Sequence, residues 1–137
     1  MRILVKMISA VALLIMVAAC VTTKPVDLPA KYNLDNDLQS VKRISASRVS
    51  NWEQADDQSL IIGVNGGQYY LLVLDRPLDA PINGETIGIS EIGTSITSGY
   101  DKVVIRFSSG IQYYVIQKMY GLKDRAQAIE YKDKLGK

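Results

Sequence analysis

Carboxylates and hydroxyls are the side chains that could do chemistry here, because the chain of 137 residues has no histidine and a single cysteine. This composition excludes a histidine-based catalytic triad, a zinc site built from His or Cys, and an internal disulfide. General acid–base catalysis would need paired carboxylates in one pocket. The acidic candidates are Asp56, Asp57, Asp75, Asp79, Glu85, Glu91 and Asp101.

Most of these acidic residues fall in segments that have the composition of turns. Asp56 and Asp57 are adjacent and good turn formers, and we interpret the pair as a solvated turn. Ser90 lacks the glycine two positions later that a nucleophile elbow needs, although a Ser–Lys dyad stays open. The sequence contains neither a calcium loop nor a glycine-rich loop that leads into a helix. It therefore predicts a protein that is not an enzyme and has no metal or cofactor.

The single cysteine lies in an informative context. A basic start is followed by an apolar run over 7–17, which covers about half of a 30 Å hydrocarbon core, as the central region of a signal peptide does. Val-Ala-Ala-Cys at 17–20 resembles the lipobox of bacterial lipoproteins. The resemblance implies cleavage between Ala19 and Cys20 and a lipid on Cys20, which would anchor the protein in a membrane. The alternative is an unmodified cysteine in an exported protein.

Loss of a leader at residues 1–19 would remove Arg2 and Lys6, which leaves 14 residues of each charge sign and no net charge. A neutral domain gives no support to a nucleic-acid partner. Val21 stands where aspartate retains a lipoprotein in the inner membrane in the sorting pattern of enteric-type bacteria. This similarity favours an outer-membrane anchor with the domain facing the periplasm, and the inner membrane is the alternative.

The rest of the chain divides into a tether and one domain. Residues 20–32 contain two prolines and no apolar periodicity, which predicts an extended tether about 30 to 40 Å long. Residues 33–137 are predicted to form a single β-rich domain that starts with a short helical or irregular passage at 33–41. Its apolar runs are short, rich in Ile, Val and Tyr, and separated by turn residues. We expect a small antiparallel sheet or partly closed barrel of about five or six strands and a C-terminal helix.

Two hairpins are the clearest local predictions. Residues 59–64 and 68–74 flank Asn-Gly-Gly, whose residues tolerate a positive φ. Residues 102–107 and 111–119 flank Ser-Ser-Gly in the same way. Further strands are expected at 44–52 and 86–90.

The segment 123–135 is predicted to be a helix. Asp124 lies in its first turn and Lys132 and Lys134 in its last, where these charges complement the helix dipole. We expect one face of this helix to carry Leu122, Ala126, Ile129 and Asp133.

Several segments together resemble a family of small, uncharacterised proteobacterial lipoproteins. Its members have a lipobox, a strand ending in Trp, an acidic turn, a Tyr-Tyr-Leu strand before a proline, and an Asp-x-Val-x-Val strand. The matching residues are Arg48, Trp52, Asp56-Asp57, 69–74, Arg76-Pro77 and 101–105. The resemblance implies a location and an architecture but no activity.

This chain departs from the family in its cysteines. Many relatives have one cysteine after the proline and another in the last strand, a pair that would staple the domain. Here Leu78 follows Pro77, and the last strand has Tyr113, Tyr114 and Val115. The core must therefore be stable without that disulfide.

Tyrosine is enriched, with eight residues. Tyr69-Tyr70 and Tyr113-Tyr114 lie in predicted strands, where neighbouring side chains face opposite sides, so one ring of each pair is expected in the core. A sharper hypothesis is an aromatic face that binds a partner protein or a glycan. Its candidate residues are Trp52, Tyr70, Tyr113 and Tyr120.

The sequence therefore favours a non-enzymatic, membrane-anchored lipoprotein that acts through protein or envelope contacts. The alternative is a carrier of a small ligand or lipid, whose sheet curls around an apolar cavity. Residues 75–100 would then form the mouth of that cavity.

Overall fold

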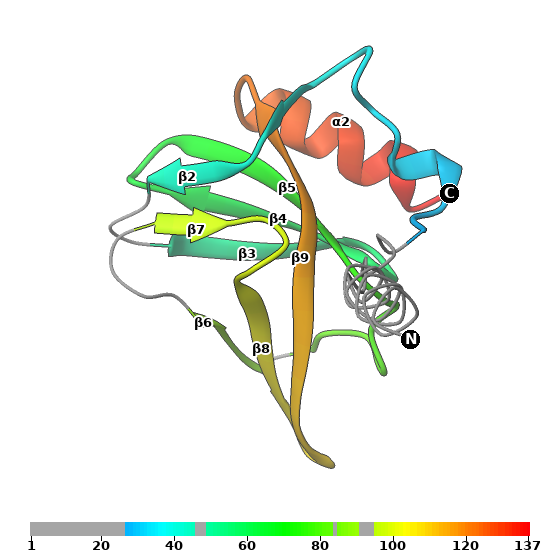
Figure 1. The fold of residues 1–137 in the computed structure, drawn as a ribbon, viewed down its shortest axis with the longest axis vertical. Coiled ribbons are helices and arrows are strands. Elements are labelled where there is room, and N and C mark those ends of the chain that lie inside the picture. The colour runs from blue at the N-terminus through cyan, green and yellow to red at the C-terminus, as the bar shows by residue number, and fades with distance from the viewer. Residues whose placement is uncertain (1–26, 46–48, 84, 91–94) are drawn as a thin grey trace, which may run out of the picture.

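The computed structural model describes residues 27–45, 49–83, 85–90 and 95–137. A curved antiparallel sheet has the strand order β3-β4-β5-β9-β8-β6, with β1 also paired to β9, and β2 and β7 form a separate ribbon (Figure 1). The mainly β fold with a C-terminal helix is confirmed, and the sheet curls into a half-barrel. The elements are η2 (Ala30–Tyr32), β1 (Gln39–Val41), β2 (Arg43–Ser45), β3 (Val49–Asp56), β4 (Ser59–Val64), β5 (Gln68–Leu74), β6 (Thr86–Ser90), β7 (Ser95–Thr97), β8 (Lys102–Phe107), β9 (Gly110–Leu122) and α2 (Arg125–Leu135).

The hairpin β4–β5 lies next to the edge strand β3 and confirms its prediction to the residue. Asn65 and Gly66 have φ values of 50° and 77°, so the turn uses the residues that tolerate this region. All six residues of β4 are buried. A strand that is apolar on both sides needs cover on both faces of the sheet.

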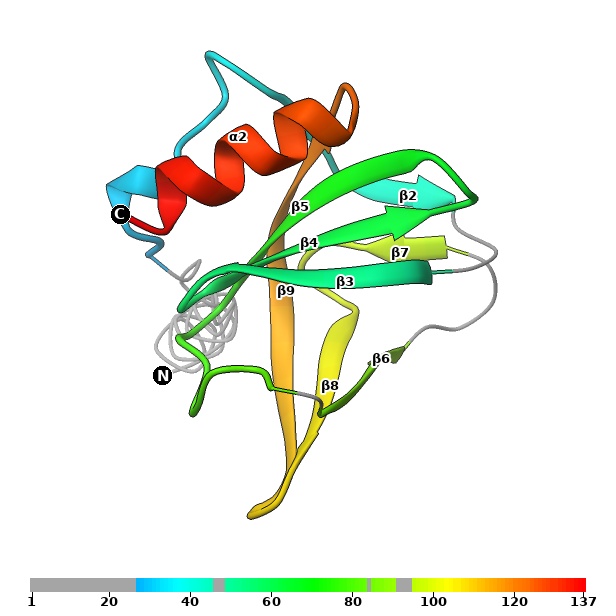
Figure 2. The same ribbon diagram turned by 180° about the vertical axis from the view of Figure 1, so that it is seen from behind.

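Two cores provide that cover. The inner core fills the concave face of the sheet, where the β2–β7 ribbon contributes Ile44 and Ile96. The outer core lies on the convex face beneath α2, which sits with η2 at one end of the molecule (Figure 2). The inner core includes Leu60, Ile62, Leu72, Leu74, Val103, Ile105, Tyr114 and Met119. The outer core includes Tyr32, Ile61, Leu71, Val73, Tyr120, Leu122, Tyr131 and Leu135.

Strand β9 is long enough to join the two halves of the sheet. It pairs with β8 through residues 110–115 and with β5 through residues 116–122. A register shift opposite Val73 and Leu74 changes its alternation. Ile116 and Met119 therefore both face the inner core although three positions separate them.

Helix α2 begins after Asp124, whose carboxylate accepts a hydrogen bond from the Gln127 backbone N–H at 2.9 Å. The prediction of the helix itself is confirmed, but the predicted face is wrong. Ala128, Tyr131 and Leu135 are buried, whereas Ile129 is 46% exposed. The predicted face and the observed face both have helical spacing, and the observed face, with Tyr131 and Leu135, buries the larger apolar surface.

Packing on the domain begins at an earlier residue of the N-terminal segment than the sequence predicts. Leu28 and Tyr32, which the sequence places in the tether, pack against the outer core, and Tyr32 is fully buried. Residues 33–38 of the passage predicted as helical or irregular are irregular, with a turn, and the helical alternative is wrong. The passage is also shorter than predicted, because β1 occupies Gln39–Val41 and pairs with β9. One apolar ring on the outer core thus outweighs the polar composition of this segment.

No helix within the described ranges is long and apolar enough to cross a membrane. The predicted leader at 1–19, its cleavage site at Ala19 and the lipid site Cys20 lie outside the described residues. Arg48 and Glu91 lie outside them too.

Candidate functional site

The acidic candidates are separated in the structure and mostly bind backbone groups. Asp75 accepts a hydrogen bond from the Val115 N–H at 3.0 Å, and the buried Asp101 accepts one from the Thr97 N–H at 2.6 Å. Asp79 accepts from the Tyr114 hydroxyl at 3.1 Å. Glu85 accepts from the Asn83 N–H. Carboxylates used in this way hold loops together.

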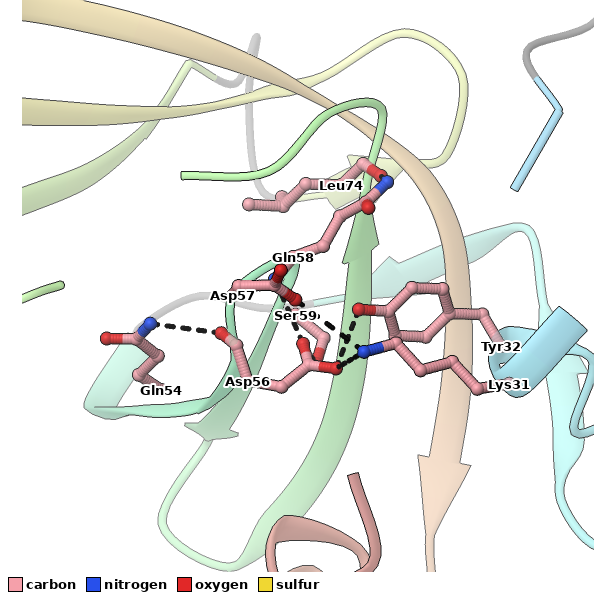
Figure 3. Close-up of polar contacts among 8 residues, drawn as sticks. All are labelled: Lys31, Tyr32, Gln54, Asp56, Asp57, Gln58, Ser59 and Leu74. Carbon is pink, nitrogen blue, oxygen red and sulfur yellow. Dashed lines mark hydrogen bonds and ion pairs between the residues drawn. The ribbon is translucent and has the colours of Figure 1, made fainter. Parts of the chain in front are cut away.

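Asp56 differs from the other acidic residues, and reading it as a solvated turn residue is wrong. Its side chain is 5% exposed, whereas that of Asp57 is 70% exposed. One carboxylate oxygen accepts from the Tyr32 hydroxyl at 2.7 Å and pairs with the Lys31 ammonium at 2.8 Å (Figure 3). The other oxygen accepts from the Ser59 hydroxyl at 2.6 Å and from the Gln58 N–H at 3.0 Å. These five residues are called the Asp56 cluster.

The electrostatics of the Asp56 cluster favour a charged carboxylate and neutral hydroxyls. Burial raises the pKa of Asp56, but donors from Lys31, Ser59, Tyr32 and the Gln58 N–H outweigh burial and hold that pKa below 3.8. Burial and the adjacent carboxylate raise the pKa of Tyr32. Its hydroxyl therefore stays a hydrogen-bond donor.

This lowered pKa predicts a pH dependence of stability. The unfolded chain takes up the Asp56 proton at a higher pH than the folded chain does, so the stabilisation by Asp56 is complete above 3.8 and is lost as the pH falls through the folded-state pKa. Urea unfolding from about pH 6 to about pH 2.5 should show this loss. In Asp56→Asn the decline at low pH should be shallower, and an equally steep decline would contradict the assignment.

Tyr120 lies at the centre of a second polar cluster, and it is fully buried. Its hydroxyl donates to the Tyr32 carbonyl at 2.6 Å and accepts from the Leu34 N–H at 3.2 Å. The Lys118 ammonium lies 2.9 Å from the same oxygen and 3.0 Å from Asp35. This Tyr120 cluster and the Asp56 cluster together are called the N-terminal clamp, because both fasten residues 31–35 to the sheet.

The four predicted aromatic contact residues do not share one surface. Trp52 and Tyr70 lie on either side of Ile62 in neighbouring strands and pack against the inner core. Tyr113 is 55% exposed on the outer face. Placing Tyr120 in an exposed contact face is wrong, because its ring is buried in the outer core and its hydroxyl is used by the clamp. The alternation predicted for Tyr113 and Tyr114 is confirmed, with Tyr114 buried.

A groove of about 520 Å³ lies along the edge strand β3. Trp52 from β3, Ile82 from the loop after β5 and Ile87 from β6 are its apolar walls. Its charged residues include Glu53 and Lys132, which form an ion pair at 2.6 Å. The inner core fills the inner face of the sheet, and the groove lies at its edge. Its lining combines apolar side chains with polar and charged ones. It is lined by Trp52, Glu53, Gln54, Ile82, Glu85, Ile87 and Lys132.

Ser90 lies on β6 opposite Lys102. Its hydroxyl accepts from the Lys102 backbone N–H at 3.1 Å and so belongs to the strand pairing. No group of three or more His, Cys, Asp or Glu side chains in the described part of the chain is arranged to hold a metal ion.

A family described as a family of unknown function (DUF6491) matches residues 2–136. The chain belongs to this family. The match covers nearly the whole chain and includes both the clamp and the groove. Neither the curated proteins nor the solved structures contain a match to the chain.

Sequence reasoning missed the N-terminal clamp. Tyr32 and Asp56 are 24 positions apart, and Tyr120 contacts Tyr32 across 88 positions. One local signal was present, because Lys31-Tyr32 is a basic and aromatic pair within an otherwise tether-like segment. Aromatic rings in linkers usually pack on a domain, since an exposed ring leaves a large apolar surface in water.

Proposed function

We propose that this protein is a lipid-anchored protein of the bacterial cell envelope that acts through contacts rather than catalysis. The observation that carries the proposal is Val-Ala-Ala-Cys at 17–20, directly after an apolar run of signal-peptide length. Lipid on Cys20 would make the membrane the first partner of this domain. Val21 after the cysteine favours the outer membrane and a periplasmic domain.

The N-terminal clamp supports this proposal because it fixes the point at which the chain from Cys20 enters the domain. Leu28 already packs on the outer core, so the stretch from 20 to 27 is the available tether. It spans at most about 25 Å when fully extended, which is less than the sequence-based length. A domain on so short a tether stays near the bilayer.

The uses of the polar side chains support a contact role. Asp56, Asp75 and Asp101 bind groups of the fold itself. The buried polar side-chain atoms of the described residues all have a hydrogen-bond partner. An active site usually keeps some polar groups aimed at a substrate.

Metabolic labelling with an alkyne fatty acid tests the anchor. The wild-type protein should incorporate the label and sediment with membranes, because Cys20 is the single cysteine. Cys20→Ala should lose the label and leave the membrane pellet. A control substitution, Ser9→Ala, changes the leader without removing the acceptor and should still be labelled. Equal and negligible labelling of wild type and Cys20→Ala would refute the proposal.

A carrier function is the second candidate, and the groove along β3 is the observation that favours it. Its volume of about 520 Å³ is within the range of small-molecule sites. Native mass spectrometry of the purified protein separates the two candidates, because a carrier should retain a lipid or metabolite. Trp52 is the single tryptophan and lines the groove, so its emission should also change when such a ligand is removed.

A further inference from the structure

The outer face of the β6–β8–β9 section carries an exposed apolar and basic surface. In the β8–β9 hairpin, Lys102, Val104 and Arg106 lie opposite Val115, Tyr113 and Ile111. Their neighbours Val103, Ile105 and Tyr114 point into the inner core, so all six point outward. These six residues are called the basic–apolar patch.

The patch lies beyond the cover that α2 gives to the rest of the outer face. The helix packs on β3, β5 and β9, and Figure 1 shows it at the opposite end of β9 from the β8–β9 turn. Ile111 and Tyr113 are 44% and 55% exposed. Next to them, Gly88 of β6 leaves a shallow hollow of about 180 Å³ beside Val104, Arg106 and Ile111.

The charges on this face have one sign. The outward positions of β6 are Thr86, Gly88 and Ser90, and those of β8 include Lys102 and Arg106. These three strands carry no acidic side chain at an outward position. Among the described residues, Lys102 and Arg106 take part in no ion pair. A surface of this kind is complementary to anionic groups.

The N-terminal segment lies on the same side of the sheet as the patch. Leu28, Tyr32 and Leu34 pack on the outer core, and the patch continues that face along β8 and β9. If Cys20 is lipidated, the tether of at most about 25 Å leaves the domain from its outer side. The bilayer is then the anionic surface that this face meets first.

We propose that the basic–apolar patch docks on a phospholipid surface that contains anionic headgroups. This inference rests on the proposed anchoring at Cys20. Lys102 and Arg106 pair with phosphate groups, while Tyr113 and Ile111 enter the interfacial region. A tyrosine ring is stable there because its body is apolar and its hydroxyl is polar. A bilayer needs no matching shape to meet this face, whereas a compact protein partner would have to be complementary to it.

Tryptophan emission tests the docking. The full chain with Trp52→Phe and Tyr113→Trp has its one indole in the patch, and the matched control has Trp52→Phe and Ile129→Trp on α2. Both proteins are purified from the producing cell and placed on vesicles of phosphatidylcholine, with or without about 30% phosphatidylglycerol, and with brominated acyl chains as quencher. The patch indole should be quenched on the anionic vesicles and much less on the neutral ones, and the α2 indole should not be quenched.

Charge removal gives the second measurement. Lys102→Gln with Arg106→Gln should lower the ratio of docked to undocked protein about tenfold or more, since each basic side chain near an anionic surface contributes about a fivefold factor. These side chains are exposed, so the double variant should fold. Absence of quenching on anionic vesicles would overturn the proposal. The proposal would also fail if, without lipid, the patch indole became shielded from solvent as the protein concentration rises, because a second copy of the chain would then cover the patch.

The anchor and the patch can fail separately. The mass of the same purified protein shows whether Cys20 carries lipid. A protein without lipid that is still quenched on anionic vesicles would refute the anchor and support the patch. A lipidated protein whose patch indole is not quenched would support the anchor and refute docking by the patch.

Discussion

Asp56→Ala is expected to lower the free energy of unfolding by about 2 to 4 kcal/mol. The buried carboxylate accepts hydrogen bonds from Tyr32, Ser59 and the Gln58 N–H and also pairs with Lys31. Its loss leaves buried donors without an acceptor, which costs more than the net value of each bond. Chemical denaturation of the purified protein measures the change.

The neighbouring residue provides the matched control. Asp57 has the same side chain in the same turn, but it is mostly exposed and its contact with Lys31 is long, at 3.6 Å. Asp57→Ala should change the free energy of unfolding by less than about 0.5 kcal/mol. Similar losses in both variants would show that the turn itself, and not the buried carboxylate, sets the stability.

Tyr120→Phe is expected to cost about 1 to 3 kcal/mol although it removes one oxygen atom. That oxygen binds the Tyr32 carbonyl, the Leu34 N–H and the Lys118 ammonium. The ring stays in the outer core, so the loss reports the polar contacts alone. Hydrogen exchange should speed up at residues 32–38 before it does so in β4 and β5, because this segment would be the first to detach.

Tyr113→Phe is the corresponding control, since it makes the same chemical change at an exposed ring of the same strand. It should be neutral within about 0.5 kcal/mol. A neutral Tyr120→Phe would mean that the N-terminal segment is held by apolar packing and that the clamp contributes little.

The parts of the fold that could be predicted are those that short segments encode. The β4–β5 turn follows from Asn65 and Gly66, because few residues other than these types adopt a positive φ. Asp124 and the lysines of the last turn indicate the ends of α2. These signals act over a few positions and do not depend on the rest of the chain.

The helix face and the course of β9 could not be predicted in this way. Two apolar sets on α2 have helical spacing, and contact with the outer core selects the one with Tyr131. The register shift in β9 depends on how β5 and β8 meet it from opposite sides. A strand that changes partners along its length needs tertiary information that periodicity does not contain.

The candidate site was the least predictable part. Asp56 and Tyr120 are both candidate residues in the sequence, but the environment predicted for each is wrong. The sequence predicts Asp56 in a solvated turn and Tyr120 on an exposed contact face, and both side chains are buried. Burial decides their roles, and it comes from an N-terminal segment whose composition is typical of a tether. Contacts over 24 to 88 positions have little local signature, and here it is limited to the Lys31-Tyr32 pair.

The N-terminal clamp and the proposed lipid anchor would together connect the domain to the bilayer. A chain that leaves the bilayer at Cys20 would reach the outer core within at most about 25 Å and be fastened there by Asp56 and Tyr120. The domain would then stand close to the membrane in a restricted range of orientations. A surface that acts through contacts benefits from such restriction, because less orientational freedom is lost on docking.

The mass of the intact protein, purified from the membranes of the producing cell, is the decisive test of the proposed lipid anchor at Cys20. We predict a chain that begins at Cys20 and carries the added mass of a diacylglyceryl group, with or without a further acyl chain on its new amino terminus. A chain that retains residues 1–19, or a mature chain with a free Cys20 thiol, would contradict it.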